Sequence, residues 1–203
     1  MNKKYSRAAI AIALAAVAAL SLTACAMPVT VGGGSMMGGD GDQNAADVMF
    51  VQMMIPHHEQ AIEMSEIILA KSGVDPDVSA LAEQIRAAQD PEITLMDQWL
   101  DDWGLPSMRG MGGMDHGGSG GTDGMDGMDG MMSDEQMHEL EDAEGADGST
   151  LFLELMIDHH EGAVEMAEDA IDDGRSSEVR ELAEQIVTSQ TAEIATMKEL
   201  LNR

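Results

Sequence analysis

An internal duplication is the strongest constraint on how this chain can fold. Residues 54–64 read Met-Ile-Pro-His-His-Glu-Gln-Ala-Ile-Glu-Met, and residues 156–166 repeat them as Met-Ile-Asp-His-His-Glu-Gly-Ala-Val-Glu-Met. A second shared segment follows each copy, because Leu-Ala-Glu-Gln-Ile at 81–85 returns at 182–186. A long segment that recurs in nearly the same register is one structural unit used twice. The chain should therefore fold as two similar halves.

The first half has the hydrophobic periodicity of two consecutive helices. Apolar residues recur three and four positions apart between residues 47 and 73, and again between residues 76 and 103. This is the period of an amphipathic α-helix. We expect Asp47 to cap the first helix, and Pro56 to kink it or to mark a helix start just before the histidine pair. Residues 47–103 are thus predicted to form a helical hairpin.

The second half, residues 133–203, repeats this arrangement after a short additional helix. Ser133 is placed to cap the short helix, which should end near Gly145. Two longer helices are expected at about 150–173 and 177–201. A single amphipathic hairpin leaves its apolar face in water, so the two hairpins should pack on each other. The sequence predicts an all-α four-helix bundle built from two duplicated hairpins.

The beginning of the chain has the composition of an export signal. Three basic residues precede a short apolar run at 8–19, and Leu-Thr-Ala-Cys follows at 22–25. The apolar run is too short for a stable membrane span. The segment resembles a bacterial lipoprotein signal. That resemblance implies removal of residues 1–24 and lipidation of Cys25, the only cysteine; plain secretion is the alternative. We expect an exported protein that is lipid-anchored to the outer face of the bacterial cytoplasmic membrane.

Two segments are low in complexity. Residues 25–46 are rich in Gly, Asp and Met and lack periodicity, so we expect a flexible tether. Residues 104–132, a linker between the hairpins, hold two Met-x-x-Met-x-x-Met arrays among Gly and Asp. Such arrays can wrap a soft metal ion, and a spacer without a binding role is the alternative. The candidate ligands of the linker are Met108, Met111, Met114, His116, Met125, Met128 and Met131.

The charge of the chain limits its partners. The net charge is −28, from 38 acidic and 10 basic residues, and every acidic residue follows Cys25. This balance argues against binding of nucleic acid and of anionic lipid. Contact with a membrane is therefore expected through the lipid anchor only. The same negative field should concentrate cations near the protein.

The duplicated segments place soft metal ligands on one face of a helix. Met54, His57 and Met64 share that face through spacings of three and four, with His58 on its flank. The partner helix of each hairpin carries Gln-x-x-Glu-x-x-x-Met along one stripe. Such residues are often ordinary core residues, but their repetition favours metal binding, and each glutamate is either a ligand or the partner that orients a histidine. The candidate ligands are His57, His58, Met54, Met64, Glu92 and Met96, and His159, His160, Met156, Met166, Glu193 and Met197.

The mixture of thioether and imidazole indicates which metal is bound. It favours copper, above all Cu(I), over magnesium, calcium or manganese. Sequestration or hand-over of Cu(I) in metal tolerance, without turnover, is the leading hypothesis. Iron is less favoured, because ferritin-type di-iron sites use paired Glu-x-x-His motifs and Glu135-x-x-His138 has no mate. Two alternatives stay open, namely a metal-dependent oxidase-type enzyme that uses Glu92 and Glu193, and a metal-free cell-envelope interaction domain.

The repeated motifs resemble the bacterial domain-of-unknown-function family 305. The likeness covers about residues 47–103 and 133–202. It implies a ferritin-like helical bundle that is exported or lipid-anchored, and some relatives are implicated in periplasmic copper binding and copper tolerance. Gly162 replaces Gln60 and Asp158 replaces Pro56, so the two copies are expected to differ in affinity. By position, the motif residues are His57, His58, Met64, His159, His160 and Met166.

Overall fold

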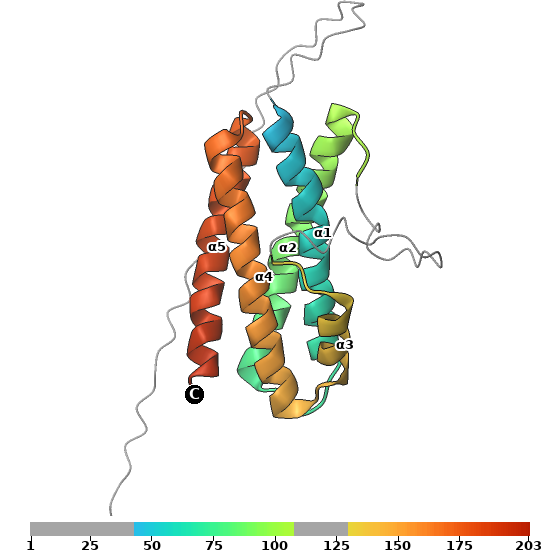
Figure 1. Cartoon of the computed structure of the whole chain (residues 1–203), viewed down its shortest axis with the longest axis vertical. Helices are drawn as coiled ribbons and strands as arrows, with labels where there is room; N and C mark the ends of the chain where they lie inside the picture. Colours follow the sequence, from blue (N-terminus) through green and yellow to red (C-terminus); the bar gives the residue numbers. More distant parts are fainter. Residues whose placement is uncertain (1–42, 108–129) are drawn as a thin grey trace, which may run out of the picture. The chain divides into compact units, whose positions relative to one another are not determined.

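The computed structural model describes residues 43–107 and 130–203, and this part of the chain forms an all-α bundle without strands (Figure 1). Helix α1 packs along α2 and α4 packs along α5, so each half is a hairpin as predicted. Helices α1 and α4 run antiparallel and join the two hairpins, while short α3 lies against both of them (Figure 1). The helices are α1 (Ala45–Leu69), α2 (Pro76–Trp103), α3 (Asp134–Asp142), α4 (Gly145–Asp173) and α5 (Ser177–Leu201).

The start of α1 corrects one prediction. Asn44, not Asp47, is the N-cap, and its side chain accepts a hydrogen bond from the Asp47 N–H at 3.0 Å. Asp47 is the third helical residue and accepts from the Asn44 N–H at 2.6 Å, which completes a capping box. The fully buried Asp47 carboxylate also accepts the N–H groups of Arg175 and Ser176 at 3.0–3.2 Å. One side chain therefore ties the start of α1 to the start of α5.

Two further boundaries differ from the sequence prediction. Helix α1 runs without interruption through Pro56, which is buried, although proline leaves the carbonyl of Gln52 without its usual helical donor. Helix α4 begins at Gly145, five residues before the predicted start. Its extra first turn is held because the Ser149 hydroxyl donates to the Gly145 carbonyl and accepts from the Asp75 N–H, at 2.9 and 3.0 Å. The bounds of α2 and α5 agree with the prediction, whereas α3 ends at Asp142 and the predicted end, Gly145, is the first residue of α4.

The hydrophobic core consists of two clusters, one in each half of the bundle's length. The Phe50 cluster joins the first half of α1 to the ends of α2 and α4 and to the start of α5. The Phe152 cluster joins the second half of α1 to the start of α2, the start of α4 and the end of α5. Phe50 and Phe152 occupy corresponding positions in the two copies. The core therefore repeats the symmetry of the sequence, and the repeated histidine pairs of the two copies fall between the clusters.

Candidate metal centre

Four histidines form a buried polar layer between the two clusters. His57 and His58 come from α1, His159 and His160 come from α4, and all four are fully buried. The rings of His57 and His159 pack against each other across the α1–α4 interface, with centroids 3.7 Å apart and an interplanar angle of 43°. The two histidine pairs, which are about a hundred residues apart in sequence, thus meet in one place.

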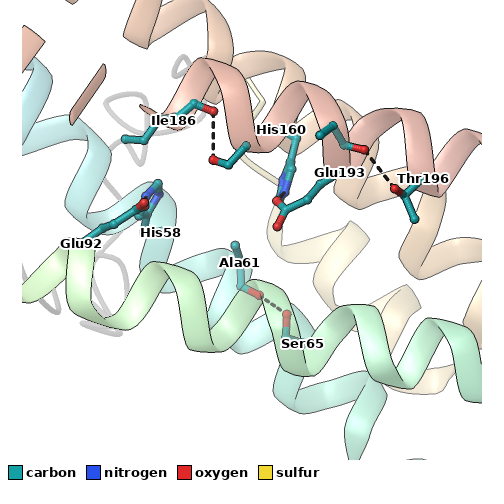
Figure 2. Close-up of polar contacts among 10 residues, drawn as sticks. His58, Ala61, Ser65, Glu92, His160, Ile186, Glu193 and Thr196 are labelled. Carbon is teal, nitrogen blue, oxygen red and sulfur yellow. Dashed lines mark hydrogen bonds and ion pairs between the residues drawn. The ribbon is translucent and has the colours of Figure 1, made fainter. Parts of the chain in front are cut away.

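Each half contributes one carboxylate that holds a histidine ring. Glu92 of α2 lies 2.7 Å from His58 Nε2, and Glu193 of α5 lies 2.7 Å from His160 Nε2 (Figure 2). An ionised carboxylate only accepts hydrogen bonds, so in both pairs Nε2 carries the proton and the Nδ1 lone pair is available in the neutral ring. Neither Nδ1 atom has a hydrogen-bond partner among the described residues. This is the geometry of a histidine prepared to ligate through Nδ1.

The layer also contains two buried amides. Gln89 lies one turn before Glu92, and Gln190 lies one turn before Glu193. Both side-chain polar atoms of Gln89 lack a hydrogen-bond partner within the described residues, and so does the Oε1 atom of Gln190. A buried polar atom left in this state costs about 1–3 kcal/mol. Several such atoms in one layer indicate a place where a ligand completes the interactions.

The environment of His159 keeps its imidazole neutral. Burial lowers the pKa of His159 well below its usual value, and repulsion from His57, His160 and His58 lowers it further. A protonated imidazole has no lone pair to give to a metal, so metal binding requires the neutral form. The layer therefore holds its central histidine in the form that can act as a ligand, even below neutral pH.

The predicted methionines divide between the two clusters that enclose the histidine layer. Met54 and Met96 are buried in the Phe50 cluster, and Met166 packs against it. The corresponding Met156 and Met197 are buried in the Phe152 cluster, together with Met64. Each set therefore mixes both copies of the repeat, because Met166 and Met64 extend from the opposite hairpin. Hairpin-by-hairpin reasoning from the sequence could not show this exchange.

The histidines and carboxylates do not form a complete metal site by themselves. Within residues 43–107 and 130–203, no three His, Cys, Asp or Glu side chains are grouped so as to hold a metal ion. A metal in this layer would also need thioether sulfur from the adjoining clusters, or small shifts of the rings. Both candidate carboxylates are already engaged with a histidine, which makes orientation the simpler role for Glu92 and Glu193.

Most of the predicted ligands of the linker lie outside the described residues. Met131 lies inside them and is partly buried. Cys25, the predicted lipidation site, also lies outside, and no helix in the described ranges has the length and hydrophobicity needed to cross a bilayer. The linker residues that the structure does not describe are Met108, Met111, Met114, His116, Met125 and Met128.

Two helical hairpins that enclose a shared layer of buried histidines define a duplicated all-α bundle protein. The chain belongs to the DUF305 family, a domain of unknown function, whose sequence profile matches residues 47–201. The resemblance expected from the repeated motif is thereby confirmed. No curated protein shows significant sequence similarity to the chain.

Solved structures of the same family support the fold. A DUF305 protein from Streptomyces coelicolor that is assumed to be secreted is 33% identical, with a TM-score of 0.66 over 77% of this chain and 92% of that one. A DUF305 fragment from Deinococcus radiodurans is 33% identical, with a TM-score of 0.67 over 79% of this chain and 98% of that one. CopM in its Cu(I)-bound form is 29% identical, with a TM-score of 0.60 over 77% of this chain and 95% of that one. CopM is also known in Cu(II)-bound and Ag-bound forms.

Proposed function

We propose that this protein binds Cu(I) in the histidine layer and sequesters it or hands it over at the cell surface, without catalytic turnover. The observation that carries the proposal is the pair of buried Nδ1 atoms on His58 and His160. Each has no hydrogen-bond partner within the described residues, while the other nitrogen of the ring is held by a glutamate. Burying imidazoles in this way is unfavourable unless something occupies the lone pairs.

The donor set supports copper as the metal. Neutral imidazole and thioether are soft or intermediate ligands, which suit Cu(I) and Ag(I) and are poor ligands for magnesium or calcium. Three predicted methionines lie in or against each of the two clusters that enclose the layer. The CopM structures, in which a protein of the same fold carries copper or silver, are consistent with this choice.

The geometry gives less support to a di-iron centre. Ferritin-type sites take a glutamate from each of two helices and a Glu-x-x-His pair from each of the other two. The Glu135-x-x-His138 pair lies on α3, where the His138 ring is exposed and contacts Glu141 at 3.1 Å. It therefore contributes nothing to the buried layer, and iron stays the less favoured metal.

The proposed location is the outer face of the cytoplasmic membrane, with the bundle held by a lipid on Cys25. Labelling of cells with a radioactive fatty acid should mark the wild-type protein and leave the Cys25→Ser variant unlabelled. Recovery of both proteins in the soluble fraction of the envelope would show that the chain is secreted without an anchor.

Metal-dependent stabilisation tests the binding proposal. A ligand that binds only the folded state stabilises it by about 2.7 kcal/mol when the free ligand is a hundred times its Kd. We expect Cu(I) and Ag(I) to raise the melting temperature of the protein and Mg²⁺ to leave it unchanged. The same Cu(I) addition should give a much smaller increase for His58→Gln/His160→Gln. An equal increase in this variant would place any binding outside the histidine layer.

A further inference from the structure

The two copies of the repeat differ at Gln60 and Gly162, and a single segment contacts both positions. We name residues 130–133, which lead into α3, the strap. On one side, the Gln60 amide donates to the Met132 carbonyl at 2.9 Å, and the Met132 N–H donates to Gln60 Oε1 at 2.7 Å. This two-point contact fixes the backbone of Met132 against α1.

On its other side the strap touches the backbone of α4. A Cβ atom on Gly130 would lie 2.9 Å from the Gly162 Cα atom and 2.9 Å from the carbonyl oxygens of Asp158 and His159. Gly130 also has a φ of +84°, which L side chains rarely adopt. Glycine at 130 is therefore needed for the strap to reach the part of α4 that carries His159. The strap spans the α1–α4 seam beside the histidine layer.

The strap places one more methionine in the core. Met132 is only 7% exposed and belongs to the Phe152 cluster, which also contains Met64, Met156 and Met197. Within the described residues, the Phe50 cluster has Met54, Met96 and Met166 and no counterpart of Met132. The repeat therefore supplies three thioethers to each cluster, and the Phe152 cluster gains buried Met132 from the strap, with Met137 of α3 partly buried against it.

We infer that Met132 is a thioether ligand for Cu(I), and that it makes the Phe152 side of the histidine layer the tighter of two binding positions. This inference rests on the proposed function and adds to it a ligand that lies outside the duplicated motif. An additional soft donor favours Cu(I). The two hydrogen bonds between Gln60 and Met132 fix the backbone of this donor before metal arrives, so less conformational freedom is lost on binding.

Methyl resonances of methionine test the inference directly. The protein is labelled with carbon-13 at the methionine methyl groups, kept free of oxygen, and titrated with Cu(I). With the first equivalent, the Met132 methyl signal should shift together with those of Met64, Met156 and Met197. If those three signals shift and the Met132 signal does not, the inference is wrong and the proposed function stands. If no methionine of the bundle responds and no Cu(I) is bound, the proposed function fails as well.

Substitution gives the second readout. Met132→Leu keeps the volume and the apolar character of the side chain, so the metal-free protein should melt within a few degrees of wild type. In this variant the Cu(I) affinity of the tighter position should fall at least about tenfold. A loss of that size already follows removal of a residue that only orients a metal ligand. Met49→Leu, at a residue that is 57% exposed near the start of α1, is the matched control and should bind as wild type does. Wild-type affinity in Met132→Leu would overturn the inference.

Discussion

Replacement of Glu92 tests whether this carboxylate orients His58 or binds the metal directly. Glu92 contacts His58 Nε2 at 2.7 Å and its side chain is 22% exposed. A hydrogen bond to a charged group contributes about 1.5–3 kcal/mol, and the partial exposure of this carboxylate places it at the lower end. Glu92→Ala should therefore reduce the free energy of unfolding of the metal-free protein by about 1.5 kcal/mol. Glu92→Gln keeps an acceptor oxygen and should lose less.

The effect of the same variants on metal binding is expected to be larger. Removing a group that orients a metal-bound histidine typically lowers metal affinity about 10- to 100-fold, which corresponds to about 1.4–2.7 kcal/mol. Competition against a Cu(I) chelator without oxygen measures this loss. Glu193→Ala is a matched variant, because Glu193 holds His160 at the same 2.7 Å and its side chain is 21% exposed. Glu83→Ala, at an exposed position of α2, is the control.

Two results would refute this reasoning. Wild-type Cu(I) affinity in both Glu92→Ala and Glu193→Ala would show that the carboxylates do not prepare the histidines for a metal. Complete loss of binding in Glu92→Gln, with unchanged stability, would point to Glu92 as a direct ligand. The structure predicts a graded series instead, with wild type tightest, Gln intermediate and Ala weakest.

Three further predictions concern stability. Because the pKa of folded His159 is held well below 6.5, the unfolded chain takes up this proton first. The free energy of unfolding, measured in urea, should therefore have its full value above about pH 6.5 and decrease below that pH by up to about 1.4 kcal/mol per pH unit. The absence of this decrease would show that His159 titrates normally. Asp47→Ala removes the acceptor of three backbone N–H groups and should cost at least about 3 kcal/mol in urea unfolding, whereas the exposed Asp77→Ala should change stability by about 1 kcal/mol or less. Replacing the buried polar ring by an apolar side chain should leave metal-free His159→Leu at least as stable as wild type in thermal melts and reduce its stabilisation by Cu(I). A strong loss of metal-free stability would show that the ring is structural.

The helical hairpins could be predicted from the sequence because helix periodicity and internal repetition are local signals. The bounds of α2 and α5, which follow from the periodicity and the repeat, agree with the structure. The start of α1 was not predictable in the same way. Asn44 and Asp47 are both good N-cap residues, and what decides between them is the contact of Asp47 with the distant start of α5.

The residues of the candidate site could be named from the sequence, but their arrangement could not. Spacing on one helix indicates that His57 and His58 lie on neighbouring faces. It does not indicate that His57 meets His159 while His58 meets Glu92. Those contacts depend on how α1 packs against α4 and α2, which is a long-range property of the fold. The role of Gln60 was hidden for the same reason, since its partner Met132 is 72 residues away.

A Cu(I) titration against a competing chelator tests the central claim most directly. Three proteins would be compared, each without residues 1–25. The first has no other change, and the second has glutamine in place of His57, His58, His159 and His160 and is shown by circular dichroism to be folded. The third lacks residues 108–129 and keeps the strap. Tight binding that is lost in the histidine variant and kept in the deletion is the predicted result. Tight binding that survives in the histidine variant and disappears with the linker would contradict the claim, because copper would then be held outside the buried layer.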